Sequence, residues 1–433
     1  MLVEVLAVEA APVDRAHLRG FALDAPRVGP RDVYDIEVAG WVLGQSQPAK
    51  GIEVHVDGTV VRRAPLDQIR EDVAREYPDA PRASLSGFRT WVSVVGLEPG
   101  AIMQIRAVLE DDKRVRLGSI VFEHEPVHSG FQPRLQPLML TTLGRAGTTW
   151  TMRLLSEHPQ IVVHRWHPYE LRTARYWWHM AKVLSEPRDP HNSAQADRFQ
   201  TDRLHLGFNP FYPEPISVTP GLHEWMGRDY VERLTNFAQT TAEETYLRIA
   251  AGQGQADPVY FAEKQRADYQ PWLVWELYPQ AKEIFLVRDF RDVVSSMLSF
   301  NAKKGYRVFG PPHIKTDAEF VRFLRNSTVK QLSRGWPKRQ DRAHLIRYED
   351  LMADPAEVLR GVLAYLGLDA SESTVAGMVG RASEENEDSI RHQTTPGGAR
   401  QSLGRWRQSL SPELQAVCNE QFADVLEQFG YEV

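Results

Sequence analysis

The chain has 433 residues, of which 42% are hydrophobic and 25% charged, and its formal net charge is −6 at pH 7. This is the composition of a globular protein long enough for two domains with sizeable cores. The negative charge argues against a nucleic-acid partner, because nucleic-acid-binding domains carry a basic face. An anionic ligand must therefore be held by local arginines and helix N-termini.

The cysteine content and the hydrophobic pattern bear on the compartment. Cys418 is the single cysteine, so an internal disulfide is excluded and a reducing compartment is favoured. Residues 1–11 have no basic segment, and two glutamates interrupt their apolar stretch, so they do not resemble a signal peptide. No segment approaches the roughly 20 apolar residues that a membrane span requires. We expect a cytoplasmic protein without a transmembrane segment, and its oligomeric state stays open.

The N-terminal part of the chain, from about residue 30 to 123, is predicted to be β-rich. Residues 33–38 and 52–56 alternate apolar and polar side chains with a period of two. The Asp57-Gly58 pair that follows is a strong hairpin signal. Further strands are predicted at residues 88–95, 102–109 and 115–122. Short strands with turns between them indicate a small all-β sandwich, which we assign as an accessory domain to residues 1–123.

The pattern changes after residues 124–136, which combine prolines and a glycine with little periodicity and are interpreted as a linker. Beyond it, short apolar runs suited to buried strands alternate with longer helical patterns. The runs are at 138–140, 259–262, 283–287 and 343–346, and the helical patterns at 271–278, 292–302, 317–333, 355–366 and 412–429. This alternation predicts an α/β domain over residues 137–433, with a parallel central sheet flanked by helices. A ligand should lie at the carboxyl ends of the strands.

The most informative segment follows the first of these strands, where the run GRAGTTW at residues 144–150 leads into an amphipathic helix pattern. A strand that turns through glycines into a helix directs several backbone N–H groups at one point, and the helix dipole adds positive charge there. Arg145 adds a full charge, and Thr148 and Thr149 add hydroxyl donors. The segment predicts a site for phosphate or sulfate. The alternative is an ordinary strand–turn–helix with small residues for packing.

The spacing differs from that of a nucleoside triphosphate P-loop. That loop has four residues between its glycines, followed by Gly-Lys-Ser/Thr, whereas only two residues separate Gly144 from Gly147 and no lysine follows. The segment resembles instead the 5′-phosphosulfate loop of sulfotransferases that use PAPS (3′-phosphoadenosine 5′-phosphosulfate). In that family Lys or Arg stands two residues before Gly-Thr-Thr-Trp, as Arg145 does here. The resemblance implies that the donor is bound by Arg145, Ala146, Gly147, Thr148, Thr149 and Trp150, the last stacking on adenine.

A second strand-to-helix segment, at residues 284–296, resembles the family's 3′-phosphate-binding segment. There an arginine and a serine eight residues later hold the ribose 3′-phosphate, and Arg288 and Ser296 match both positions. Tyr348 resembles the family tyrosine near the adenine. Arg400, ahead of Gly-Arg-Trp-Arg at 404–407, resembles the C-terminal region that closes over the 3′-phosphate. The alternatives are solvated charges for the arginines and core packing for the aromatic residues.

The resemblance implies a reaction. An acceptor oxygen attacks the sulfur of PAPS in line and 3′,5′-ADP departs, with positioning and charge stabilisation supplying most of the catalysis. Lysine usually fills the position of Arg145 in the family. Arg145 would neutralise charge on the leaving phosphate as a fixed clamp, although arginine does not hand over a proton at ordinary pH. Lys264 resembles a family lysine near the sulfuryl group. No metal is required, and the sequence has no clustered His/Cys/Asp set at ligand spacing.

The general base is predicted from where the chain departs from the cytosolic pattern. Cytosolic members use a histidine two residues after the lysine, and Arg266 stands at that position. Carbohydrate-type members place a glutamate shortly after the first helix and second strand, where Glu170 lies. Glu170 is the first choice as base and His167 the second, and Glu263 is a further candidate. The alternative for Glu170 is an ion pair with a nearby arginine.

The leading hypothesis is a PAPS-dependent sulfotransferase acting on a small-molecule or glycan acceptor, with the base pattern favouring a carbohydrate or glycolipid. Aromatic residues at 176–180 and 208–212 suit sugar rings or phenols, with packing as the alternative. A nucleotide-dependent kinase is disfavoured by the missing Gly-Lys-Ser/Thr. A non-catalytic nucleotide- or glycan-binding protein is the third hypothesis, because Arg145 and Arg266 depart from the usual pattern and the sandwich resembles accessory domains of bacterial sugar-modifying enzymes.

Overall fold

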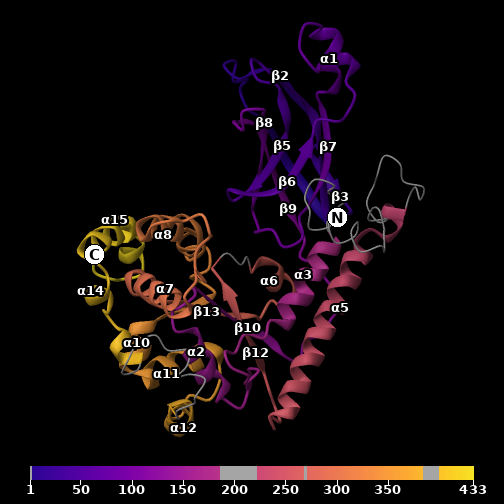
Figure 1. The fold of residues 1–433 in the computed structure, drawn as a ribbon. Helices are drawn as coiled ribbons and strands as arrows, with labels where there is room; N and C mark the ends of the chain where they lie inside the picture. Colours follow the sequence, from indigo (N-terminus) through magenta and orange to yellow (C-terminus); the bar gives the residue numbers. More distant parts are fainter. Residues whose placement is uncertain (1, 186–221, 268–270, 384–398) are drawn as a thin grey trace. The chain divides into compact units, whose positions relative to one another are not determined.

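The structure, a computed structural model, describes residues 2–185, 222–267, 271–383 and 399–433 (Figure 1). The chain divides into two compact units. The N-terminal unit comprises Met1–Gln132, Arg175–Thr241 and Pro271–Leu277, and the C-terminal unit comprises Pro133–Ala174, Ala242–Gln270 and Tyr278–Val433. None of the described helices combines the length and the apolar character needed to cross a membrane.

The N-terminal unit contains an antiparallel β-sandwich. One sheet has the strand order β3-β1-β9-β8-β5-β6, and the other has the order β2-β4-β7. The strands are β1 (Val3–Ala10), β2 (Leu18–Ala25), β3 (Gly29–Arg31), β4 (Asp35–Gly44), β5 (Ala49–Val56), β6 (Thr59–Pro65), β7 (Gly87–Ser93), β8 (Ile102–Leu109) and β9 (Arg114–His124). Two short helical segments, α1 (Glu71–Glu76) and η1 (Ala83–Leu85), lie between β6 and β7.

The predicted hairpin at Asp57-Gly58 is confirmed as the turn between β5 and β6. Both residues have positive φ, 49° and 73°, as a two-residue hairpin turn of this kind requires. In contrast, β1 and β2 lie before residue 30, outside the region predicted to be β-rich. Both strands contain register shifts, which interrupt the period of two on which the prediction depends. Residues 125–135 contain neither helix nor strand, whereas β9 runs one residue into the segment interpreted as a linker.

Three helices contribute to the N-terminal unit, namely α3 (Thr173–Ser185), α5 (Leu222–Gly252) and α6 (Trp272–Leu277). Glu276 of α6 accepts a hydrogen bond of 3.2 Å from the backbone N–H of Gly96, and its carboxylate lies 4.0 Å from Nε2 of His124. Lys182 of α3 donates a hydrogen bond to the backbone oxygen of Val95. These contacts attach α3 and α6 to the loop after β7 and to the end of β9.

The C-terminal unit is built on a five-stranded sheet in the order β11-β12-β10-β13-β14, and all its neighbouring strands are parallel. Its strands are β10 (Gln136–Thr142), β11 (Ile161–Val162), β12 (Tyr260–Arg266), β13 (Lys282–Val287) and β14 (Ala343–Arg347). Its helical segments are α2 (Thr148–Ser156), α7 (Phe290–Lys304), α8 (Asp317–Leu324), the π-helical turn η2 (Arg325–Val329), α9 (Lys330–Gly335), α10 (Tyr348–Ala353), α11 (Pro355–Leu366), α12 (Glu372–Ser383), η3 (Ala399–Ser402), α14 (Trp406–Ser409) and α15 (Pro412–Gln428).

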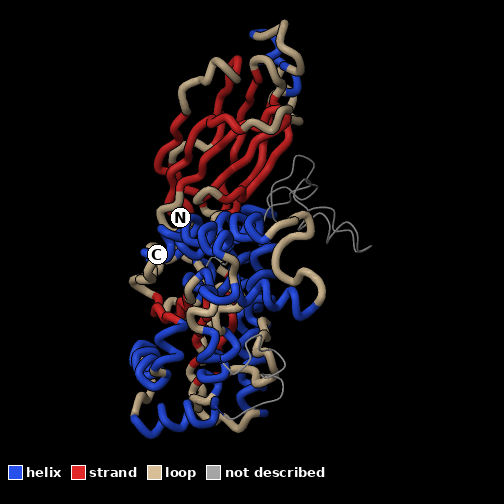
Figure 2. Tube along the Cα trace, turned by 60° about the vertical axis from the view of Figure 1, so that its left-hand side comes forward, coloured by secondary structure: helices blue, strands red, loops and turns tan. Residues whose placement is uncertain are grey.

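Helices cover both faces of this sheet (Figure 2). On one face, Leu140 and Ile284 pack in a core that includes Met152 of α2 and Leu363 of α11. On the other face, Phe285 lies in a second core with residues of α7 and α15. Because both faces are buried, the strands contain continuous apolar runs, such as residues 138–140 of β10 and 284–287 of β13, which the sequence pattern predicts. The predicted fold class, a parallel sheet flanked by helices after an all-β region, is confirmed.

The sequence did not predict α5, which is 31 residues long. Its buried positions combine Val231 and Tyr246 with the polar Thr235, Gln239 and Glu243 and with small alanines, so the buried side of the helix is not a continuous hydrophobic stripe. Glu243 is buried because its carboxylate accepts backbone N–H groups just before β10. A helix whose buried face consists largely of small and polar residues carries little periodic signal.

We predict that Glu276 makes the stability of the protein depend on pH. Burial raises the pKa of Glu276 from 4.5 to about 7, so its stabilising contribution is present below pH 4.5 and is lost as the pH rises through 7. A shift of this size corresponds to roughly 3 kcal/mol. Glu276→Gln should therefore unfold at higher urea concentration than wild type at pH 8, and the advantage should shrink toward pH 5. Glu125→Gln, at an exposed position, is the control, and the same pH dependence in both variants would contradict the prediction.

Candidate active site

The site begins at the turn between β10 and α2. Arg145 and Gly147 both have positive φ, 66° and 92°, and Gly147 is the N-cap of α2. A Cβ on Gly147 would overlap the ring of Tyr348, so only glycine fits there. The turn brings the unpaired N–H groups of the first turn of α2 to the carboxyl edge of the sheet, where Thr142 aligns with Arg266 of β12 and Leu286 of β13. This geometry suits an anion.

Arg145 links this turn to α7. Its Nε donates a hydrogen bond of 3.1 Å to Oγ of Ser296, and its guanidinium lies 4.8 Å from the ring centroid of Phe300. Its backbone oxygen accepts a hydrogen bond of 3.1 Å from Nη1 of Arg288. Burial and the neighbouring charge of Arg288 lower the pKa of Arg145 to about 10. Arg145 is therefore a half-buried cation at neutral pH, in contact with both residues that the sequence assigned to the 3′-phosphate.

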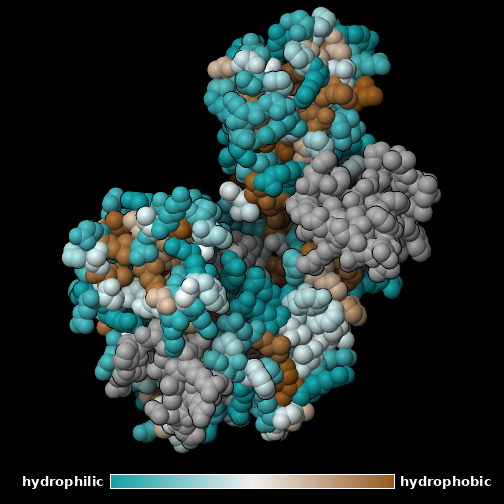
Figure 3. Space-filling model, viewed as in Figure 1, coloured by the Kyte–Doolittle hydropathy of each residue, from teal (hydrophilic) through white to brown (hydrophobic). Residues whose placement is uncertain are grey.

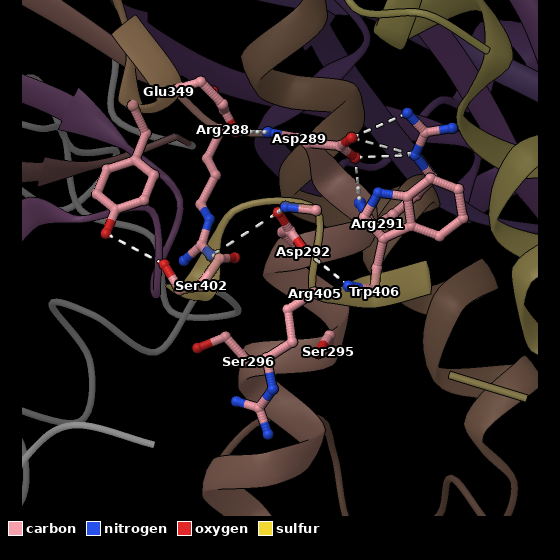
Figure 4. A network of polar contacts seen from close by, with 12 residues as sticks. Arg288, Asp289, Arg291, Asp292, Ser295, Ser296, Glu349, Ser402, Arg405 and Trp406 are labelled. Carbon is pink, nitrogen blue, oxygen red and sulfur yellow. Dashed lines mark hydrogen bonds and ion pairs between the residues drawn. The ribbon is translucent and has the colours of Figure 1, made fainter. Parts of the chain in front are cut away.

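Arg288 lies directly after β13, and Figure 4 shows its side chain extending toward the segment that contains Ser402. Its Nη2 donates a hydrogen bond of 2.7 Å to the backbone oxygen of Ser402 and lies 3.9 Å from the carboxylate of Asp292. Its guanidinium stacks over the ring of Tyr348 at 4.6 Å. Arg288 is 6% exposed, and its Nε is buried with no hydrogen-bond partner. That Nε remains available for a ligand.

Asp292 holds the C-terminal segment against α7. Its two carboxylate oxygens accept the backbone N–H groups of Gly404, at 2.7 Å, and Trp406, at 2.9 Å (Figure 4). Burial raises the pKa of Asp292, while the charge of Arg288 and these hydrogen bonds oppose that rise. The indole of Trp406 stacks under the guanidinium of Arg291, 4.1 Å away. The segment resembling the family's C-terminal region is thus packed beside the residues resembling its 3′-phosphate segment.

Lys264 lies on β12, on the opposite side of β10 from β13, which Arg288 follows. Its ammonium donates hydrogen bonds to Oγ1 of Thr149, at 3.3 Å, and to the backbone oxygen of Pro168, and it lies 3.7 Å from the carboxylate of Glu170. Burial lowers the pKa of Lys264 to about 8, although Glu170 opposes the shift. The side chain of Glu170 is 53% exposed. Lys264 therefore contacts both the predicted anion-binding loop, at Thr149, and the predicted general base, Glu170.

The other candidate bases occupy different surroundings. His167 lies in the same loop as Glu170, between β11 and α3. Glu263 is buried, and its carboxylate accepts hydrogen bonds from the backbone N–H of Ala174, at the start of α3, and from the hydroxyl of Tyr246. Successive strand residues point to opposite faces, so Glu263 faces away from the site that Lys264 faces. Its contacts are those of a helix cap.

Trp150 lies in the first turn of α2, and its indole N–H is buried without a hydrogen-bond partner. The backbone of Arg400 lies in η3, but its side chain and residues 208–212 lie outside what the structure describes.

The sequence did not predict two hydrogen-bond acceptors of the site, the backbone oxygens of Ser402 and Pro168. Backbone acceptors carry no residue-type signal, so only the fold locates them. Among the described residues, no group of His, Cys, Asp and Glu side chains is arranged to hold a metal ion.

Residues 137–372 match the model of the sulfotransferase family. The chain belongs to the sulfotransferase family. Three solved structures show weak similarity to this sulfotransferase. They are the sulfotransferase domain from the curacin biosynthetic pathway (14% identity, 69% of this chain and 99% of that one, TM-score 0.40), that of the Synechococcus PCC 7002 olefin synthase (19%, 71% and 98%, 0.37) and mouse sulfotransferase SULT7A1 complexed with PAP (13%, 69% and 86%, 0.35). A search of curated proteins gave no match.

The site of this sulfotransferase fits a nucleotide with an anionic group at each end. The first turn of α2 offers backbone N–H donors beside Thr149, and Arg288 offers an unpartnered buried Nε. The cations Arg145, Arg288 and Lys264 surround these donors. The two carboxylates near them, Asp292 and Glu170, are each close to one cation. The residues present are therefore suited to hold PAPS.

We predict that Gly147→Ala destabilises the sulfotransferase. The substitution places a Cβ against the ring of Tyr348 and forces alanine into positive φ, which together should lower the free energy of unfolding by about 1–3 kcal/mol. Urea denaturation followed by tryptophan fluorescence measures the change. Gly380→Ala in α12 is the control, because its Cβ would meet no atom and its φ is not positive. Equal stability of the two variants would show that the turn can relax without strain.

Proposed function

We propose that this sulfotransferase takes the sulfuryl group of PAPS, transfers it to a hydroxyl or amine acceptor and releases 3′,5′-ADP. The contact between Arg288 and the backbone oxygen of Arg145, together with that between Arg145 and Ser296, carries this proposal. These hydrogen bonds join the loop resembling the 5′-phosphosulfate site to the residues resembling the 3′-phosphate site. A continuous cationic surface of this kind suits a nucleotide with separate 3′ and 5′ anionic groups better than a single triphosphate chain.

The donor-binding roles follow from the groups available. The N–H groups of Thr148 and Thr149, with the Thr149 hydroxyl, would receive the 5′-phosphosulfate at the N-terminus of α2. Arg288 and Ser296 would receive the 3′-phosphate, with Arg400 assigned to it by the resemblance. Trp150 and Tyr348 would contact the adenine. The unpartnered nitrogens of Arg288 and Trp150 support this assignment, since buried donors normally have partners.

PAPS, when bound, supplies an activated sulfuryl group. The chain supplies charge and proton transfer around it. Arg145, with a pKa of about 10, stays protonated at neutral pH and acts as a fixed clamp for the leaving phosphate. Lys264 positions Glu170 through their ion pair and touches Thr149 of the loop. Glu170, half-exposed and next to the loop, would accept the proton of the acceptor hydroxyl, with His167 as the second candidate.

We propose a carbohydrate or glycolipid as the acceptor. The position of Glu170 matches the carbohydrate-type pattern, and Trp166, four residues before it, is 76% exposed. An exposed indole offers a flat apolar face with a polar edge, which suits the face of a sugar ring. A kinase has no support beyond the nucleotide site, since the Gly-Lys-Ser/Thr run is missing. A binding protein without activity would share the donor site, and a measurement of turnover distinguishes it from an enzyme.

We predict that the protein binds 3′,5′-ADP at least tenfold more tightly than 5′-AMP or ATP, without metal, in calorimetric titrations. Arg288→Gln should remove this preference, because a hydrogen bond to a charged group contributes about 1.5–3 kcal/mol. Ser296→Ala should weaken it less. Arg360→Gln, which removes an exposed arginine of α11 that pairs with Glu357, should change nothing. Equal affinity of the wild type for 3′,5′-ADP and 5′-AMP would contradict the proposed donor.

We predict that Glu170→Gln lowers turnover by about 10²–10⁴-fold, the usual contribution of a general base, while 3′,5′-ADP affinity stays within twofold of wild type. Turnover is measured as 3′,5′-ADP released from PAPS with a panel of monosaccharide and glycolipid acceptors. His167→Gln serves as the comparison. A large loss in His167→Gln with none in Glu170→Gln would transfer the base to His167. Donor binding by the wild type without turnover on any acceptor would favour a binding protein.

A further inference from the structure

The outward face of the six-stranded sheet carries arginines on neighbouring strands. Glu53 of β5 lies opposite Arg63 of β6 and Arg106 of β8, and Arg106 lies opposite Arg116 of β9. Arg114, two residues before Arg116, lies on the same face because strand side chains alternate. We term Arg63, Arg106, Arg114 and Arg116 the arginine face. The alternate residues of these strands, such as Val54 and Ile105, are buried between the sheets.

The arginine face carries more positively charged than negatively charged side chains. Glu53 is buried and receives hydrogen bonds from Arg63 and Arg114 at 3.2 Å and from His55 at 3.0 Å. Burial opposes its ionisation, but the hydrogen bonds outweigh that effect and lower the pKa of Glu53. Arg106 and Arg116 hydrogen-bond the neutral side chains of Gln104 and Ser119. Four guanidinium groups thus lie near two carboxylates, those of Glu53 and of Glu9, which accepts a hydrogen bond of 3.4 Å from the Ser119 hydroxyl, on a chain whose net charge is −6.

One pair of arginine side chains on this face is destabilising when no anion is bound. Arg106 and Arg116 are direct cross-strand partners in the sheet, and like charges in that position destabilise a sheet. An anion lying across both guanidinium groups would relieve the repulsion and accept hydrogen bonds from each. The side chains of Arg63 and Arg114 are 53% and 43% exposed, so a ligand can reach them. Figure 3 shows a largely hydrophilic surface over the sandwich in this view.

We propose that the arginine face binds the sulfate or carboxylate groups of an anionic polysaccharide. Guanidinium groups bind such oxyanions through paired hydrogen bonds. Arg106 and Arg116 lie on adjacent strands, which are about 4.8 Å apart, and Arg63 lies two strands from Arg106 with Glu53 between them. Gln104 and Ser119, on the same strands as Arg106 and Arg116, add hydrogen-bonding groups suited to hydroxyls. The choice of a glycan as the carrier of the anions rests in part on the proposed carbohydrate acceptor.

The composition of the face favours a polysaccharide over nucleic acid. In β5, β6, β8 and β9, all of which the structure describes, the one Phe, Tyr or Trp is Phe122, which is 1% exposed. Single-stranded nucleic acid is normally bound by stacking its bases on exposed aromatic rings. Duplex DNA is read by a helix or ribbon that enters a groove, whereas this face is the flat side of a sheet.

The test is binding of fluorescein-labelled dextran sulfate to the full chain, measured by anisotropy, with neutral dextran and duplex DNA as competitors. We expect competition by unlabelled dextran sulfate and none by neutral dextran. The double variant Arg106→Gln and Arg116→Gln should lose at least tenfold in affinity. It removes a repulsive pair, so its thermal stability should not fall. The double variant Arg27→Gln and Arg89→Gln removes the same charge elsewhere in the N-terminal unit and should change affinity less than twofold.

A further variant is expected to change the affinity in the opposite direction. Glu53→Gln removes the carboxylate that accepts hydrogen bonds from Arg63 and Arg114 and should tighten dextran sulfate binding, a result that partial unfolding would not produce. Equal losses in the two arginine double variants, no binding to dextran sulfate, or tighter arginine-dependent binding to DNA would each overturn the proposal. The affinity for 3′,5′-ADP should be unchanged in Arg106→Gln with Arg116→Gln, so failure of the donor assignment and failure of this proposal are distinguished.

Discussion

The buried guanidinium of Arg288 is the interaction on which the site depends. It follows β13 and contacts three separate segments: the loop at Arg145, the C-terminal segment at Ser402 and the ring of Tyr348. A buried cation is costly unless it is paired, and Asp292, 3.9 Å away, supplies the counter-charge while it also holds the C-terminal segment. Partial burial, together with the neighbouring charge of Arg288, lowers the pKa of Arg145. A phosphate between the two guanidinium groups would relieve their repulsion, so this repulsion in the ligand-free site favours phosphate binding.

The two sides of β10 differ in a way that matches the two halves of the proposed reaction. On one side, Arg288 is buried and donates to two backbone oxygens, and Arg145 is half-buried and donates to the Ser296 hydroxyl, which suits a part of the donor that does not react. On the other side, Lys264 reaches Glu170, whose carboxylate is half-exposed. An acceptor must enter from solvent and release a proton. The N-terminus of α2, which follows β10, is where the transferred group would lie.

In the N-terminal unit too, individual carboxylates interact with a few neighbouring groups, although the whole chain has a negative net charge. Glu276 is buried against the loop after β7, and Glu53 is shared by several cationic groups on the outward face of the sheet. In both units, carboxylates contact cationic side chains or accept hydrogen bonds from backbone N–H groups, as Glu53, Glu276 and Asp292 do. The net charge of −6 therefore gives no measure of the sites available to anions, because each site depends on a few neighbouring groups.

Local patterns in the sequence determined the elements that depend on neighbouring residues. The strand at 102–109 and the helix at 355–366 were predicted with the bounds they have, and the turn before α2 was predicted from its glycines, because glycine adopts positive φ most readily, as Gly147 does. Only the tertiary structure decided the direction of the Arg145 side chain toward Ser296, the capping of α3 by Glu263 and the pairing of Lys264 with Glu170. These contacts join residues about 90 to 150 positions apart. Periodicity and turn signals report the backbone within a few residues, whereas the partner of a buried charge is set by which strands become neighbours in the sheet.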